Sequence, residues 1–116
     1  MGTSLRLLLH VAQKESWGAA IGNAFNFLKS ANPADKLEVR LIANGDSVES
    51  CSPCAPELLS RLSMLSDHSV QIFLCENSLK AHGIDASSLP SFVKTVPAGI
   101  RALAELQEEG WRYVRP

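Results

Sequence analysis

The sequence predicts an α/β domain in which a five-stranded, mainly parallel sheet is covered by helices on both faces. Short apolar segments with many β-branched residues alternate with segments whose apolar residues recur at helical spacing. One short segment, residues 70–75, is almost continuously apolar, as is typical of a strand buried on both sides. The 116 residues are enough for one core, so we expect a single domain over residues 1–116.

The expected strands differ in how their apolar residues are arranged. Residues 5–11 are apolar almost throughout, whereas residues 37–43 alternate, with Glu38 and Arg40 on the second face. We therefore expect the strand at 37–43 to lie near an edge of the sheet, and the final strand at 111–115 to form another edge. The five expected strands are residues 5–11, 37–43, 70–75, 92–96 and 111–115.

The first two helices are expected between the first three strands. Ser16 can cap a helix over residues 17–30, where apolar residues recur at helical spacing. Gly18 and Gly22 lie inside this helix rather than before it, so they do not form a glycine-rich phosphate loop. Pro56 suits the first turn of the second helix. The apolar face of that helix is expected to consist of Leu58, Leu59, Leu62 and Leu65.

The other two helices follow the third and fourth strands. Asn77 is a good N-cap for a short helix that Gly83 ends. Pro97 can open a longer helix over residues 98–109, which Gly110 closes.

The topology brings several reactive side chains to one edge of the predicted sheet. We expect the strand order 2-1-3-4-5, with the switch in chain direction between the first and third strands. His10 ends the first strand and Cys75 ends the third, so both would flank the crevice at this switch point. Cys51 and Cys54, in the loop after the second strand, would lie over the same edge and outside the core.

The overall charge and the cysteine count exclude several classes of function. Eleven basic residues against twelve acidic ones give a net charge of −1, so nucleic acid is not an expected partner. The apolar runs are too short to span a membrane, and residues 7–9 are too short for a signal-peptide core, so we expect a cytoplasmic protein without membrane contact. Three cysteines in a reducing compartment favour thiol or metal chemistry over a disulfide framework.

Four segments of the chain carry a resemblance to a known family. Two of their motifs are the most specific: Cys-x-Asn-Ser-Leu at residues 75–79 and Glu-Gly-Trp-x-Tyr-x-Arg-Pro at residues 109–116. The four segments are LLLHV at 7–11, WGAAIGNAFNFLK at 17–29, FLCENSLKAHGI at 73–84 and the final residues 96–116. Through these segments the chain resembles the DsrE/DsrF-like family, and specifically its small stand-alone members.

The resemblance implies a flavodoxin-like, three-layer α/β/α fold and a homo-oligomer, usually a homotrimer or homohexamer. In the sulfur-relay members of the family, a cysteine at the end of the third strand carries sulfur as a persulfide. Cys75 falls at that position. The partners so implied are other copies of the chain and a protein that donates or accepts sulfur. The pair Cys51 and Cys54 is not part of the family pattern.

Two residues are the catalytic candidates, Cys75 and His10. Cys75 is either a sulfur-carrying thiolate, activated by the helix that follows it, or a small buried hydrophobic residue. His10 either orients a substrate and polarises Cys75, or is satisfied by backbone at a strand end. Asn44 and Asn77 are ligand-binding candidates, with turn and cap roles as the alternative.

Cys51-Ser-Pro-Cys54 has the dithiol spacing of redox proteins and is the redox candidate. The alternatives are two incidental loop cysteines, or half of a zinc site completed by Cys75 and His10. No second spaced cysteine pair accompanies it, and we expect neither a metal nor a cofactor.

The leading hypothesis is a DsrE-like homo-oligomer that binds or relays sulfur through Cys75. A non-catalytic, oligomeric module that binds a small ligand or a partner remains the alternative, as does a thiol–disulfide or zinc protein that uses Cys51 and Cys54. We also expect the strand at 111–115, with its aromatic residues Trp111 and Tyr113, or its neighbouring helix, to lie at a subunit contact.

Overall fold

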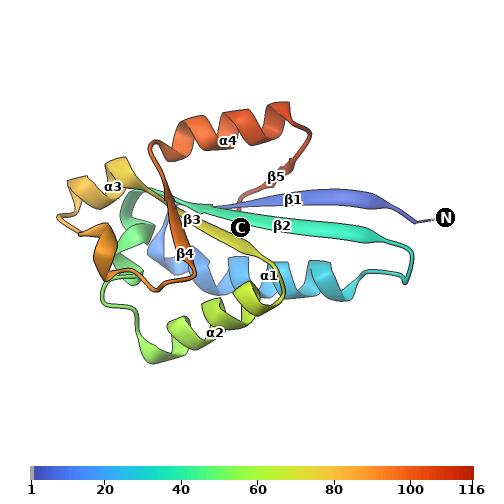
Figure 1. The fold of residues 1–116 in the computed structure, drawn as a ribbon, viewed down its shortest axis with the longest axis horizontal. Helices are drawn as coiled ribbons and strands as arrows, with labels where there is room; N and C mark the ends of the chain where they lie inside the picture. Colours follow the sequence, from blue (N-terminus) through green and yellow to red (C-terminus); the bar gives the residue numbers. More distant parts are fainter. Residues whose placement is uncertain (1) are drawn as a thin grey trace.

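The computed structural model describes residues 2–116 and shows a five-stranded sheet between two layers of helices (Figure 1). All neighbouring strands are parallel. The predicted three-layer α/β/α fold is therefore confirmed. The strands are β1 (Ser4–Val11), β2 (Lys36–Ala43), β3 (Gln71–Cys75), β4 (Val93–Val96) and β5 (Arg112–Val114).

The strand order is β4-β3-β2-β1-β5, so the expected order 2-1-3-4-5 is wrong. The chain runs outward from β1 to β4 and then returns to place β5 on the other side of β1. The switch in direction therefore falls at β1, with β2 on one side and β5 on the other.

The expectation that β2 lies near an edge is also wrong, because β2 pairs with both β1 and β3. Its charged residue Arg40 is accommodated in this central position by aromatic stacking. The guanidinium lies 4.7 Å from the ring centroid of Trp111 and 6.0 Å from that of Phe73. Arg40 also donates a hydrogen bond from Nε to Oε1 of Gln71 at 2.7 Å.

Helices cover both faces of the sheet. The α-helices are α1 (Trp17–Lys29), α2 (Pro56–Asp67), α3 (Glu76–Ala81) and α4 (Gly99–Glu108). Three short 3₁₀ turns are η1 (Lys14–Ser16), η2 (Gly45–Ser50) and η3 (Ala86–Ser88). Helices α1 and α2 lie on one face and α4 lies alone on the other (Figure 1). Within residues 2–116, no helix has both the length and the apolarity needed to cross a membrane.

The helix boundaries agree with the sequence to within one or two residues, but one of the predicted N-caps is wrong. Ser16, which also ends η1, is the N-cap residue of α1 as expected, although its side chain makes no capping hydrogen bond. Asn77 lies inside the first turn of α3, and Cys75 occupies the N-cap position instead. Gly83 has a φ of 65°, the left-handed conformation that glycine adopts readily after a helix.

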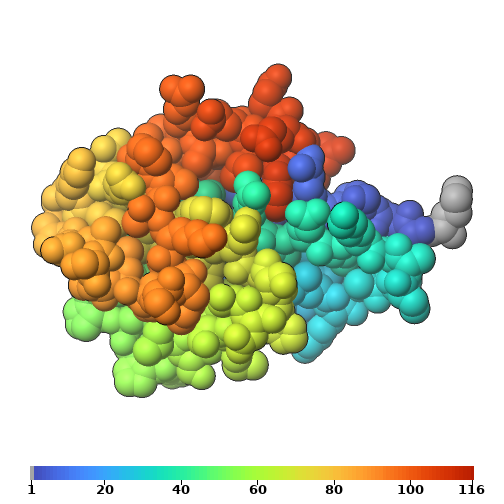
Figure 2. Space-filling model, in the orientation of Figure 1, coloured from blue at the N-terminus to red at the C-terminus, as the bar shows by residue number. Residues whose placement is uncertain are grey.

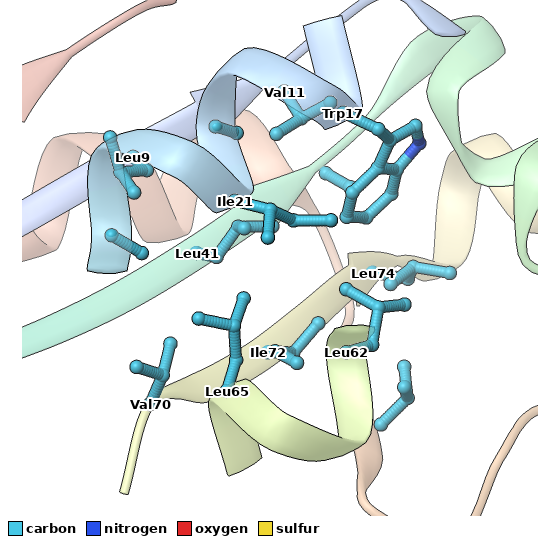
Figure 3. Packing of buried hydrophobic residues seen from close by; sticks show 14 of the residues in the cluster. Leu9, Val11, Trp17, Ile21, Leu41, Leu62, Leu65, Val70, Ile72 and Leu74 are labelled. Atoms are coloured by element: carbon cyan, nitrogen blue, oxygen red, sulfur yellow. The ribbon is translucent and has the colours of Figure 1, made fainter. Parts of the chain in front are cut away.

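The main core lies between the sheet and the pair α1 and α2. Figure 3 shows Leu9, Val11, Trp17, Ile21, Leu41, Leu62, Leu65, Val70, Ile72 and Leu74 in this core. Each large aliphatic side chain that is fully buried contributes about 1.5–3 kcal/mol relative to an exposed one. Two expectations need correction here, because Cys51 is buried in this core whereas Leu59 is 38% exposed.

A second, smaller core lies under α4 on the opposite face. It consists of Leu8, Ile42, Leu103, Leu106 and Trp111. Trp111, just before β5, is therefore buried within its own chain.

The sheet has two edges, β4 and β5. β5 was expected at an edge, and this is confirmed. Arg6 holds this edge in place, because its guanidinium lies 5.3 Å from the Trp111 ring centroid and donates to the carbonyl of Glu109. At the other edge, the segment of β4 reaches the surface between α4 and α2 (Figure 2).

Candidate functional site

Cys75 lies where β3 ends and α3 begins, as the sequence predicts. It is the N-cap residue of α3, and only 5% of its surface is exposed. β4 lies beside it, with Cys75 opposite Val96, and α4 begins shortly after β4 at Gly99. The starts of two helices therefore converge on one thiol.

The approach of α4 to Cys75 is so close that any side chain at position 99 would crowd its neighbours. A Cβ there would lie 3.1 Å from the Cβ of Cys75, 3.3 Å from the Cβ of Asn44 and 3.6 Å from the cysteine sulfur. Gly99 thus allows the backbone of α4 to reach the sulfur.

These surroundings lower the pKa of the Cys75 thiol. Burial acts in the opposite direction and raises it, but the Ser78 hydroxyl and the backbone N–H groups of Gly99, Ser78 and Asn77 outweigh burial. The neutral thiol makes no regular capping hydrogen bond in α3, so these donors act mainly on the thiolate. Ser78 is itself held in place, because its Oγ accepts a hydrogen bond from the Gly45 N–H at 2.8 Å.

His10 lies at the same edge of the sheet, 8% exposed, and both of its ring nitrogens have partners. Nε2 lies 2.8 Å from Oδ1 of Asn44, and Nδ1 lies 2.6 Å from the hydroxyl of Tyr113. In the neutral ring, Nε2–H donates to Asn44, and the Tyr113 hydroxyl donates to Nδ1. Three strands, β1, β2 and β5, are thereby joined by side chains where they end.

The structure corrects the expectation that His10 polarises Cys75 directly. β2 lies between their strands, and Cys75 stands two residues beyond Phe73, which is the residue of β3 in register with His10. Asn44 connects them: its Oδ1 accepts from His10, and its Cβ lies beside Gly99 at the thiol. Asn44 thus lies between the two catalytic candidates.

Asn77 contributes to the site through its backbone N–H, whereas the sequence suggested its side chain. Its backbone N–H favours the Cys75 thiolate, while the residue as a whole is exposed. Its predicted role in ligand binding stays a prediction.

Cys51 and Cys54 form a separate site beside η2. Both are free thiols, Cys51 buried and Cys54 partly exposed, and the two residues form an isolated antiparallel bridge. Burial and the neighbouring Cys54 raise the pKa of Cys51 to about 12. Burial also raises the pKa of Cys54.

The structure does not assemble the hypothetical zinc site. Among residues 2–116, one cluster of three potential ligands is found, Asp46, Glu49 and His82, and it contains no cysteine. His82 presents Nε2 to Asp46 at 3.5 Å and Nδ1 to Glu49 at 3.2 Å, and Lys14 lies 3.4 Å from Glu49. Because the carboxylates approach different ring nitrogens, we interpret this cluster as a network of surface ion pairs.

Sequence reasoning missed three residues of the site: Ser78, Gly99 and Tyr113. Ser78 follows Cys75 at the spacing by which an N-cap side chain meets the third helical residue, a usable signal. Tyr113 could have been inferred only from the pairing of β5 with β1. Gly99 stands at a helix start, where glycine carries no distinctive signal.

Comparisons with known proteins agree with this picture. The model of the DsrE/DsrF-like family matches residues 9–116. Two solved structures are similar over 97% of this chain and 99% of their own. One is the protein of unknown function MTH1491 from Methanobacterium thermoautotrophicum, with a TM-score of 0.86 and 24% identity. The other is the ychN protein from E. coli, with a TM-score of 0.77 and 16% identity. No curated protein matches the chain.

Proposed function

Because the chain belongs to the DsrE/DsrF-like family, we propose that it relays sulfur as a persulfide on Cys75. The observation that carries the proposal is the convergence of donors from α3 and α4 on one sulfur, which lowers the pKa of the thiol. A thiolate is the nucleophile that sulfur transfer requires.

The proposed chemistry is a balanced exchange between two thiols. The Cys75 thiolate attacks the outer sulfur of a donor persulfide, a new S–S bond forms, and the donor's own S–S bond breaks. The donor leaves as a thiolate with the electron pair of the broken bond. An acceptor thiolate then takes the outer sulfur from Cys75 by the same step, which returns Cys75 to its thiolate.

His10, Asn44 and Tyr113 are positioning residues in this proposal. Asn44 packs against the start of α4, and its hydrogen bond to His10 fixes its orientation. Tyr113 in turn fixes the ring of His10. The chain of contacts keeps the Gly99 N–H directed at the sulfur.

A surface hollow of about 360 Å³ lies between the end of β4 and the first turns of α4, and we propose it as the approach for the sulfur donor. It is lined by Val96, which is opposite Cys75 in the sheet, by Ala98, which precedes Gly99, and by Arg101 of α4. Arg101 offers a positive charge to an anionic sulfur species, but Glu105, which also lines the hollow and lies 3.5 Å from Arg101, offsets part of that charge.

The test is mass spectrometry after treatment with inorganic polysulfide. We expect the Cys75 peptide to gain one sulfur atom, which dithiothreitol removes. Cys75→Ala should abolish the gain, whereas the matched control Cys54→Ala should retain it. Sulfur on Cys54 with none on Cys75 would contradict the proposal.

We further propose that the protein works as a cytoplasmic homo-oligomer, a trimer or hexamer, with the side formed by α4 and β5 at the contact. This side exposes Ile100 to 72% and both Tyr113 and Val114 to 40%. Sedimentation at micromolar concentration should show no monomer, and Ile100→Glu should shift the protein to smaller species. Met64→Glu, at a residue 50% exposed on the opposite face, is the matched control. A wild-type monomer would refute this assembly.

A further inference from the structure

The segment Cys51-Ser-Pro-Cys54 places two thiols opposite one another directly after η2. Directly opposed residues of an antiparallel bridge have Cα atoms about 4.5–5.5 Å apart. A disulfide spans Cα distances of about 4.4–6.8 Å. The two free cysteines can therefore close into a disulfide with little movement of the backbone.

We propose that Cys51 and Cys54 form a reversible redox dithiol, independent of Cys75, that reacts with small disulfides such as oxidised glutathione. The two cysteines differ in exposure, and this difference gives them different roles in the reaction. Cys54 is partly exposed, so it is the thiol that meets the small disulfide. Cys51 is 1% exposed and packs in the main core, so only the sulfur of Cys54 can reach it.

The electrostatics agree with this geometry. Burial and the neighbouring Cys54 raise the pKa of Cys51, and burial raises that of Cys54, so neither thiol gains stability by ionising at neutral pH. A dithiol whose reduced form is stabilised by ionisation is a strong oxidant when oxidised, as in low-pKa redox pairs. Here the reduced pair gains no such stabilisation from ionisation, which favours the disulfide form over the dithiol.

The reaction proceeds in two balanced exchanges with one molecule of small disulfide. Cys54 loses its proton and attacks one sulfur of the small disulfide, whose S–S bond breaks to release the first thiolate. Cys51 then loses its proton and attacks the sulfur of Cys54 in this mixed disulfide, releasing the second thiolate. The protein loses two hydrogens, and the small disulfide is reduced to two thiols.

The test equilibrates the full-length protein with mixtures of oxidised and reduced glutathione, blocks free thiols with N-ethylmaleimide, and maps the products by mass spectrometry. We expect the loss of two hydrogens in the peptide that contains Cys51 and Cys54, in wild type and in Cys75→Ala alike. A disulfide stabilises the fold less when its loop is short, but even a loop of this length gives some stabilisation. The folded protein should therefore be half oxidised at a roughly tenfold lower proportion of oxidised glutathione than the guanidinium-unfolded chain.

Two variants separate the roles of the cysteines. In Cys51→Ala, a glutathione adduct should accumulate on Cys54, because no second thiol resolves it. In Cys54→Ser, Cys51 should stay unmodified while the protein is folded. Two free thiols in the wild-type protein under oxidising mixtures would overturn the proposal. So would an oxidised fraction that is lower in the folded protein than in the unfolded chain, a measurement that stands even if Cys51→Ala does not fold.

Discussion

Cys75 and Cys51 are both buried cysteines, 5% and 1% exposed, yet their thiols have pKa shifts of opposite sign. At Cys75, the Ser78 hydroxyl and three backbone N–H groups favour the thiolate over the effect of burial. At Cys51, burial is joined by a second thiol, which disfavours the charge further. Depth in the protein therefore does not decide the reactivity of a cysteine. The donors that face the sulfur do.

The local backbone explains where these donors come from. Cys75 stands at a strand end where α3 begins and α4 approaches, so N–H groups without helical partners point at the sulfur. Cys51 follows η2 and packs in the main apolar core, and the causes of its pKa shift are burial and the neighbouring Cys54. The surroundings of Cys75 thus favour the thiolate, whereas those of Cys51 favour the neutral thiol.

The largest expected difference between the two regions is the rate of alkylation. In the folded protein near neutral pH, Cys75 should react with iodoacetamide about a hundredfold faster than Cys51, because the larger thiolate fraction outweighs the lower intrinsic nucleophilicity of a low-pKa thiolate. The lowered pKa places the midpoint of the Cys75 pH–rate profile below that of an unperturbed cysteine thiol. A midpoint above roughly 9 would contradict the lowered pKa of Cys75 and, with it, the opposite shifts of the two thiols.

The second expected effect comes from filling the space at Gly99. Gly99→Ala should cost about 1–3 kcal/mol in the free energy of unfolding, since the new Cβ would lie 3.1 Å from that of Cys75. It should also raise the pKa of Cys75 by displacing the N–H of residue 99. Gly22→Ala, in α1 with no atom within 4 Å of the new Cβ, is the matched control and should stabilise the protein by about 0.5–1 kcal/mol. Equal stability of the two variants would contradict the close approach.

The third prediction separates Cys51 from Cys54 and replaces the sequence-based expectation that both are dispensable. Cys51→Ser should cost about 1–2 kcal/mol because it buries a hydroxyl in an apolar core. Cys54→Ser should cost less than about 1 kcal/mol, because this residue is partly exposed. Urea unfolding of the two variants, under reducing conditions, measures both costs. If Cys51→Ser is as stable as the wild type, Cys51 is dispensable for the fold, as the sequence suggested.

The smallest expected effect concerns a single donor at Cys75. Ser78→Ala should raise the pKa of the thiol, and the backbone donors that remain in place should limit the rise. Asn77→Ala keeps its backbone N–H and should leave the pH–rate midpoint unchanged. A shift with Asn77→Ala and none with Ser78→Ala would mean that the side chain of Asn77, as first expected from the sequence, faces the sulfur.

The helices and strands could be predicted because the spacing of apolar residues is a local property of the chain. The strand order could not, since it depends on long-range pairing and on compensation between distant residues. The charged face of β2 indicated an edge, but Arg40 stacks on Trp111 and Phe73, which lie far away in the sequence. The sequence carried no sign that these aromatic rings would allow a guanidinium in the central strand.

The candidate site was predictable in part for the same reason. Cys75 and His10 mark strand ends, and strand ends follow from local pattern. Their separation by β2 and the bond between His10 and Tyr113 follow from the strand order. The burial of Cys51 was missed because a loop residue has no periodicity that would show which way its side chain points.

The position of β5 has a consequence for how the molecule is made on the ribosome. β5 leaves the ribosome after the four other strands, yet it pairs with β1, the first of them. Until it arrives, β1 has an open edge, Arg6 lacks its stacking partner Trp111, and the ring of His10 is held by Asn44 alone. The nascent protein can therefore form the surroundings of Cys75 early, while the fixation of His10 waits for Tyr113, a long-range contact made late.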